Sequence, residues 1–154
     1  MDIEDILDPG AIAQRVSAAD KRQALSIAAE IAGRQFGLKP STVLNALLRR
    51  ETQGSTGVGH GVAIPHARVR GLDRIHGIFV RLEAPVDFGA DDQKPVDLLF
   101  ALLGPPDAEV GHLTALAKVS RIFRSTELRN QLRYASGADA IRALLFQTAR
   151  PTAA

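Results

Sequence analysis

An almost wholly apolar run in the second half of the chain constrains the fold more than any other segment. Val96 to Leu103 contains a single charged residue, Asp97, and Gly104-Pro105-Pro106 follows it. Such a run is typical of a central strand covered on both faces, because a strand with one solvated face alternates apolar and polar residues. A sheet covered on both faces needs helices on each side. The run therefore predicts an α/β protein.

Segments on either side of this run have the signals of helices. Asp20 and Gln23 predict the start of a helix that ends at Gly37. Pro40 predicts the start of a second helix, which ends near Glu51. Three more helices are expected after the apolar run: one over about 110–123, one capped by Ser125, and one beginning near 136.

Shorter apolar segments predict the remaining strands: an edge strand over 11–16, a very short buried strand over 62–64, and a strand over 76–82. Pro9-Gly10 is expected to break the segment before the first of these, and Ala84-Pro85 to end the last. The expected fold is a small mixed β-sheet flanked by helices on both faces. One domain is expected over residues 1–154, with 149–154 as a frayed tail.

Composition excludes several classes of protein. The chain has no cysteine, which removes disulfides, thiolate metal sites and thiol catalysis. The formal net charge is +2 with mixed signs along the chain, so neither nucleic-acid binding nor membrane-surface binding is expected. The acidic start does not resemble a secretory leader, and no apolar run approaches the roughly 20 residues of a membrane span. We expect a cytoplasmic protein without membrane insertion.

The chemistry is expected in a glycine-rich stretch from Gly54 to His66. Four glycines within eight residues are followed by Val62-Ala63-Ile64, Pro65 and then His66. This pattern predicts a loop, a short buried strand and a histidine displayed at its end. Imidazole titrates near neutrality and can attack phosphorus, and phosphoryl transfer needs mainly positioning and charge neutralisation. Glycine N–H groups, Arg50 or Arg68, and a second histidine such as His112 could supply these.

Other kinds of site fit the residues less well. The stretch lacks both G-x-G-x-x-G before a helix and the P-loop sequence, which disfavours nucleotide binding. His60 and His66 are six residues apart in a loop and do not share a helix face, so we expect no metal and no cofactor. By spacing alone, Arg50 could be a solvated charge at a helix end, and His112 a histidine without a catalytic role.

Two blocks of sequence resemble a known family. Arg50-Glu51-Thr52-Gln53-Gly54-Ser55-Thr56-Gly57-Val58-Gly59-His60-Gly61-Val62-Ala63-Ile64-Pro65-His66 is similar to the phosphorylation-site signature of enzyme IIA, mannitol/fructose type. These proteins belong to the bacterial phosphoenolpyruvate:sugar phosphotransferase system. Residues 95–103, with His112-Leu113 and Leu116-Ala117, resemble the second hallmark of the family. The Gly-Ser-Thr-Gly variant resembles most the nitrogen-regulatory branch.

The resemblance implies a role for each residue of the site. It implies that His66 accepts a phosphoryl group from a phosphorylated HPr-like carrier through Nε2, that His112 stabilises this group and that Arg50 neutralises it. Candidates to bind the phosphate or the partner are Ser55, Thr56, Gly57, Gly59 and Gly61. His60 departs from the family, which commonly has Asn or an acidic residue there. His60 and Arg68 are candidates to support the site from behind the contacting groups.

The predicted function is a phosphoryl relay that regulates nitrogen or potassium metabolism through its phosphorylation state. The resemblance implies regulatory targets such as potassium-transport regulators or sensor kinases. The alternative is a sugar-specific IIA component that feeds a separate IIB protein and permease. No IIB with its usual cysteine is expected within this chain. A pure binding module and a metal hydrolase fit less well, and a homodimer stays open.

Overall fold

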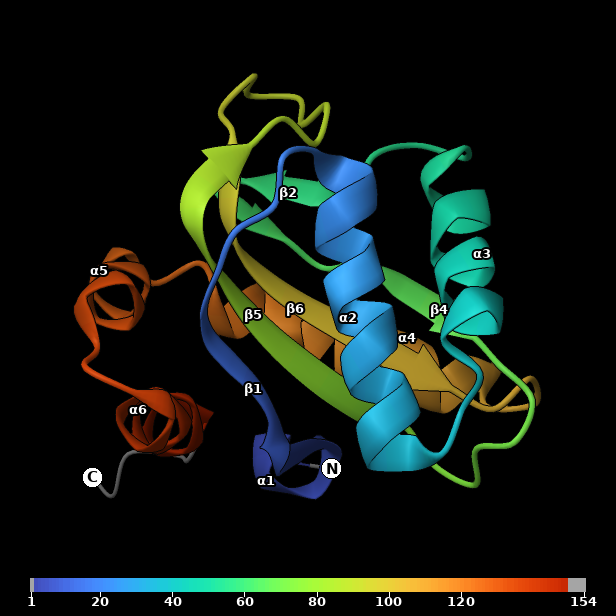
Figure 1. Cartoon of the computed structure of the whole chain (residues 1–154). Coiled ribbons are helices and arrows are strands. Elements are labelled where there is room, and N and C mark those ends of the chain that lie inside the picture. Colours follow the sequence, from blue (N-terminus) through green and yellow to red (C-terminus); the bar gives the residue numbers. More distant parts are fainter. Residues whose placement is uncertain (1, 150–154) are drawn as a thin grey trace.

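A six-stranded sheet lies between two groups of helices in the computed structural model, which describes residues 2–149 (Figure 1). The helices are α1 (Ile3–Ile6), α2 (Lys21–Phe36), α3 (Pro40–Glu51), α4 (Glu109–Ile122), α5 (Thr126–Tyr134) and α6 (Ala138–Ala149). The strands are β1 (Leu7–Val16), β2 (Gly57–Gly59), β3 (Val62–Ala63), β4 (His66–Arg68), β5 (His76–Val86) and β6 (Val96–Gly104).

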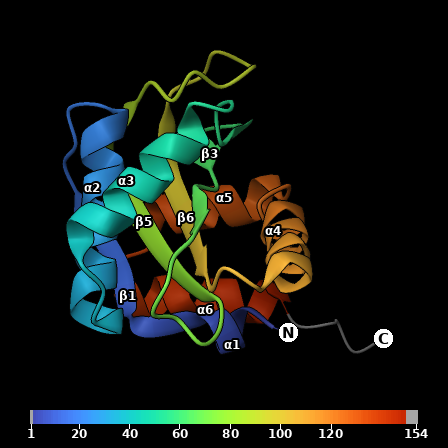
Figure 2. The same cartoon turned by 90° about the vertical axis from the view of Figure 1, so that its right-hand side faces the viewer.

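The sheet is mixed, as the sequence predicts. Its strand order is β1-β5-β6-β3-β2, and β4 also pairs with β6. β6 is antiparallel to β5 and parallel to both β3 and β4. Helices α2 and α3 cover one face of the sheet, and α4, α5 and α6 lie on the other (Figures 1 and 2). The predicted α/β fold with helices on both faces is confirmed.

The apolar run forms the centre of this sheet. Every residue of β6 except Asp97 is buried. Phe100 packs near Phe123, at the end of α4, with ring centres 6.1 Å apart. Burial on both faces explains why the strand does not alternate. The prediction of a central strand over 96–103 is confirmed.

The predicted helix boundaries are confirmed at Asp20, Gly37, Pro40 and Ser125, whereas α6 begins at Ala138, two residues after the Ser136 expected to cap it. The Asp20 carboxylate accepts a hydrogen bond from the Gln23 N–H at 2.8 Å. Gly37 ends α2 with a φ of 70°, which glycine adopts without strain. Pro40 begins α3, and the Ser125 hydroxyl accepts the Leu128 N–H at 3.1 Å at the start of α5.

The predicted strand limits are wrong in two places. Pro9-Gly10 does not end the first segment but lies within β1, an edge strand, where a missing backbone donor is tolerated. β5 continues through Ala84-Pro85 to Val86, which pairs with Val96. The short strands β2 and β4 are not predicted.

Two further expectations concern the termini and the membrane. Ala149 is the last residue of α6 rather than the first of a tail, and 150–154 lie outside the described residues. Within residues 2–149, no helix combines the length and the apolar character needed to span a bilayer.

Candidate active site

Two short strands on one side of β6 hold His66. β3 pairs with the first half of β6 and β4 with the second half, and His66 lies opposite Leu102. Between the two strands, Pro65 interrupts the ladder because it has no N–H, yet its carbonyl accepts the Leu102 N–H at 2.8 Å. His66 therefore projects from backbone that is fixed on the central strand.

The two ring nitrogens of His66 have different partners. Nδ1 lies 2.9 Å from the carbonyl oxygen of Ile64, which can only accept a hydrogen bond. Nδ1 therefore carries the proton. Arg50 Nε donates to Nε2 at 3.0 Å, so Nε2 presents its lone pair. The neighbours of the ring thus select the tautomer in which Nδ1 carries the proton and Nε2 the lone pair.

Arg50 lies in the last turn of α3 and is half-buried. Besides the bond to His66, its Nη1 donates to the Gly54 carbonyl at 2.8 Å. Within residues 2–149, no carboxylate forms an ion pair with its guanidinium. Arg50 therefore brings a positive charge to His66 and does not extend into solvent as a charge at a helix end would.

His112, in the first turn of α4, lies beside the His66 ring. Its ring centre lies 5.4 Å from that of His66, and the residue is 8% exposed. Its Nδ1 is buried beside Gly104, without a hydrogen-bond partner in the described part of the chain. A histidine in the first turn of the helix that follows the central strand thus lies beside His66.

Burial lowers the pKa of both histidines. Burial lowers the pKa of His112 to about 4, and the charges of His66 and Arg68 add to this effect. Burial is also the main cause that lowers the pKa of His66 below its ordinary value of 6.5, and Arg50 contributes. The Ile64 carbonyl and Glu51 act in the opposite direction. Near neutral pH, the lowered pKa leaves the His66 ring predominantly uncharged.

These residues line one cleft of about 430 Å³. Its cationic side chains outnumber its single carboxylate, which suits an anionic group. Apolar side chains of α3 and α4 form part of the wall. The lining residues are Ala46, Arg49, Arg50, Gln53, His66, Ala67, Arg68, Glu109, His112, Leu113 and Leu116. The sequence does not predict that Arg49, Gln53 and Glu109 line this cleft, because their positions depend on how α3 and α4 approach β4.

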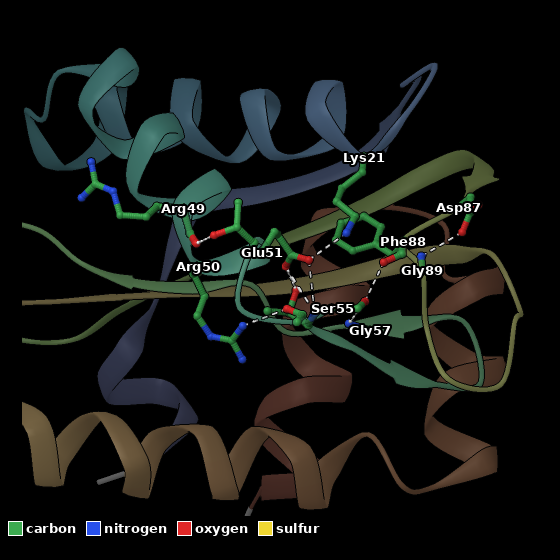
Figure 3. Close-up of polar contacts among 12 residues, drawn as sticks. Lys21, Arg49, Arg50, Glu51, Ser55, Gly57, Asp87, Phe88 and Gly89 are labelled. Carbon is green, nitrogen blue, oxygen red and sulfur yellow. Dashed lines mark hydrogen bonds and ion pairs between the residues drawn. The ribbon is translucent and has the colours of Figure 1, made fainter.

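The five predicted phosphate- or partner-binding residues of the glycine-rich stretch do not line this cleft. The Ser55 hydroxyl donates to the Phe88 carbonyl at 2.6 Å and accepts the Gly57 N–H at 3.0 Å (Figure 3). Thr56 is 4% exposed and bonds to the Glu51 carboxylate. Gly57 and Gly59 bound β2, and Gly61 is buried with a φ of 80°. Their direct contact with phosphate or a partner stays a prediction.

The two residues predicted to support the site, Arg68 and His60, lie on different clefts. Arg68 lines the cleft with His66. His60 is exposed on a second cleft, with a φ of 58°. Its N–H donates to Asp92 at 2.8 Å, and its carbonyl accepts from Arg133 at 2.7 Å.

Metal ligation has no geometric support in the part of the chain that the structure describes. Residues 2–149 contain no group of three or more His, Asp or Glu side chains arranged to hold a metal ion.

Comparisons with known proteins agree over nearly the whole chain. Residues 5–148 match the family model described as "Phosphoenolpyruvate-dependent sugar phosphotransferase system, EIIA 2". A nitrogen regulatory protein of Bradyrhizobium diazoefficiens is 41% identical over 145 residues, which cover 94% of this chain and 95% of the relative. A nitrogen regulatory protein of Escherichia coli is 38% identical over 149 residues, which cover 96% of this chain and 91% of the relative.

Solved structures show the same likeness. The crystal structure of the nitrogen regulatory protein IIA-Ntr from Neisseria meningitidis matches with a TM-score of 0.87 at 38% identity, covering 93% of this chain and 98% of that one. IIA mannitol from Escherichia coli matches with a TM-score of 0.75 at 22% identity, covering 90% and 97% of the two chains. The second match is a likeness in fold.

Proposed function

Because the chain belongs to the EIIA 2 family of the phosphoenolpyruvate-dependent sugar phosphotransferase system, as its sequence predicts, we propose that His66 accepts a phosphoryl group from a phosphorylated HPr-like carrier. Membership makes the protein a phosphotransferase component. In this proposal His66 is the acceptor, Arg50 and His112 stabilise the transferred group, and the phosphorylation state regulates other proteins.

The hydrogen bonds of the His66 ring carry this proposal. A nucleophilic nitrogen needs a free lone pair directed at the donor, and the Nδ1 bond to Ile64 leaves that lone pair on Nε2. Arg50 Nε, 3.0 Å from Nε2, is close enough to move from the lone pair to an incoming phosphoryl oxygen. The neutral ring of His112 and the guanidinium of Arg68 line the same cleft.

The transfer step balances without an additional proton. The Nε2 lone pair of His66 forms the new P–N bond while the P–N bond of the carrier's phosphohistidine breaks. If the carrier ring is protonated on its other nitrogen, it leaves as neutral imidazole. His66 keeps its Nδ1 proton and becomes a phosphorylated imidazolium, which the Ile64 carbonyl stabilises at 2.9 Å. Arg50 offsets the negative charge that arrives.

A regulatory role is supported by the relatives. The nitrogen regulatory proteins of Bradyrhizobium diazoefficiens and Escherichia coli match over 95% and 91% of their lengths. Phosphorylation adds about −1.5 to −2 charges to the cleft. Val110 and Leu113, which are 78% and 63% exposed, lie on α4 beside His112. A partner that docks on this apolar rim would bind the two states differently, because phosphorylation changes the charge beside it.

Phosphotransfer from the carrier, read by intact mass, tests the proposal. The wild-type protein is expected to gain one phosphoryl group that is labile in acid and stable in alkali. His66→Gln should gain none. His60→Gln, at the exposed histidine outside the cleft, is the matched control and should be labelled normally. Undiminished labelling of His66→Gln would contradict the proposal.

A second measurement separates the regulator from the sugar-specific alternative. The phosphorylated protein is mixed with each IIB protein of the host, and with a potassium-transport regulator or a sensor kinase. Binding of a regulator that depends on phosphorylation, without onward transfer to a IIB cysteine, supports the regulatory role. Rapid transfer to a IIB protein supports the sugar-specific role.

A further inference from the structure

A buried carboxylate beside the cleft has no part in the proposed transfer step. Glu51 is the last residue of α3, and its side chain is only 6% exposed. Burying a carboxylate is costly unless it is paired and hydrogen-bonded. Lys21 on α2 places Nζ 2.9 Å from Oε2 of Glu51 and 5.2 Å from the centre of the Phe88 ring (Figure 3). The pair thus joins α2 to the end of α3.

Thr56 binds the same carboxylate twice. Its N–H lies 3.3 Å from Oε1 and 3.2 Å from Oε2 of Glu51, and its hydroxyl donates to Oε1. The Thr56 carbonyl in turn accepts the Ile64 N–H at 3.0 Å. The Ile64 carbonyl holds Nδ1 of His66. A continuous series of hydrogen bonds therefore connects Glu51 to one nitrogen of the acceptor ring.

The other nitrogen of His66 depends on the same turn. Arg50, which donates to Nε2, is itself fixed by its 2.8 Å bond to the Gly54 carbonyl. Gly54 lies in the segment 52–56. The hydrogen bonds between Thr56 and the Glu51 carboxylate tie the end of this segment back to the end of α3. Both partners of the His66 ring are thus attached to a segment whose shape Glu51 maintains.

The pairing of Glu51 also affects the charge available at the cleft. Glu51 and Arg50 are adjacent in sequence, and an unpaired carboxylate there would attract the guanidinium. Lys21 occupies the carboxylate instead. Among residues 2–149, no carboxylate forms an ion pair with Arg50. Its charge therefore stays directed toward His66.

We propose that Glu51, paired with Lys21, is a positioning residue that fixes the 52–56 turn so that Arg50 and Ile64 align the His66 ring for attack. The kinetic consequence rests on the proposed function. The alignment of the ring does not, because it is a property of the protein in the absence of any partner.

Glu51→Gln tests this role. The amide can still accept a hydrogen bond from Thr56 but cannot form the ion pair with Lys21. The kcat for phosphorylation by the carrier should fall roughly tenfold or more, since small misplacements of reacting groups are costly, while KM for the carrier stays within about twofold. Nitrogen NMR should show a lower His66 pKa, because the negative charge of Glu51 raises it. The signals should also show a smaller excess of the tautomer protonated at Nδ1.

The matched control is Glu83→Gln, which removes an exposed ion pair of 2.6 Å with Arg15. It should change neither kcat nor the His66 titration. Wild-type kcat and an unchanged His66 titration in Glu51→Gln would overturn the proposal.

Two further outcomes are distinguishable. If Glu51→Gln fails to fold, Thr56→Val removes only the hydroxyl link to Glu51 and should lower kcat in the same way; wild-type values for that variant would also overturn the proposal. If the wild-type protein is not phosphorylated by any carrier, the proposed function fails. The His66 titration in the variants still decides whether Glu51 positions the ring.

Discussion

Mild acid is expected to destabilise the protein through His112. The ring is buried beside His66, and its pKa falls from 6.5 in an unfolded chain to about 4 in the folded protein. The unfolded chain therefore binds the proton more tightly than the folded protein. By linkage, the contribution of His112 to stability is complete above about pH 6.5 and is lost as the pH falls toward 4.

The magnitude follows from these two pKa values. At about pH 5 most unfolded molecules carry the His112 proton and most folded molecules do not, which lowers the free energy of unfolding by about 2 kcal/mol relative to about pH 7.5. Such a loss is a substantial part of the stability of a small domain. Removing the imidazole should remove this part of the pH dependence.

Urea denaturation of the wild-type protein and His112→Gln at both pH values measures this contribution. Far-UV circular dichroism is the suitable signal, because the chain has no tryptophan and a single tyrosine. On going from about pH 7.5 to about pH 5, the wild-type protein should lose about 2 kcal/mol more than the variant. His60→Gln, at an exposed histidine, is the control and should follow the wild type.

The comparison is repeated in a His66→Gln background, because the two rings lie 5.4 Å apart and a charge on one affects the other. A difference below about 0.5 kcal/mol in both backgrounds would refute the reasoning, since one pKa unit corresponds to about 1.4 kcal/mol. The ring of His112 would then titrate as an exposed histidine does.

Three other predictions follow from the site and its surroundings. Phosphorylation of His66 should be fastest above pH 6.5 and slow in more acid solution as the ring gains a proton; single-turnover transfer measures this, and a rate that rises in acid contradicts it. Arg50→Lys keeps the charge but loses the fixed geometry of the guanidinium, so quenched-flow transfer should be roughly tenfold to hundredfold slower; an unchanged rate would remove Arg50 from the step. Gly61→Ala should lower the free energy of unfolding by about 1–3 kcal/mol in urea, because φ is 80° and the new Cβ would overlap Nη2 of Arg133. Gly37→Ala, at a φ of 70° in open space, should cost about 1 kcal/mol, and equal losses would exclude a contribution from the overlap.

The sequence predicts the elements whose signals are local. Asp20 and Gly37 bound α2 through side-chain capping and a left-handed φ, which single residues determine. Pro9 and Pro85 give wrong strand limits because the effect of a proline on a strand is not local. Their effect on a strand depends on whether the missing N–H faces a neighbour, and this depends on sheet order rather than on adjacent residues.

The candidate site is harder than the helices to predict from local sequence signals. A glycine-rich stretch before His66 indicates the proposed acceptor, but the residues alone leave open whether Arg50 or Arg68 serves it, and the family resemblance is what favours Arg50. The Lys21–Glu51 pair has no sequence signal, because the two residues are thirty positions apart and meet only when α2 packs beside α3. Polar contacts between helices follow from packing, which composition and periodicity do not specify.

The three central groups of the cleft come from three different layers of the molecule. Arg50 belongs to a helix on one face of the sheet, His66 to the sheet itself and His112 to a helix on the other face. If either helical layer detached, His66 would still be present on the sheet, but the arrangement of groups around it would be lost. Under the proposed function, only fully assembled molecules would enter the phosphorylated pool. Heat or proteolysis that loosens one layer should then abolish labelling while most of the secondary structure persists, so that phosphorylation reports on the integrity of the protein as well as on the state of its carrier.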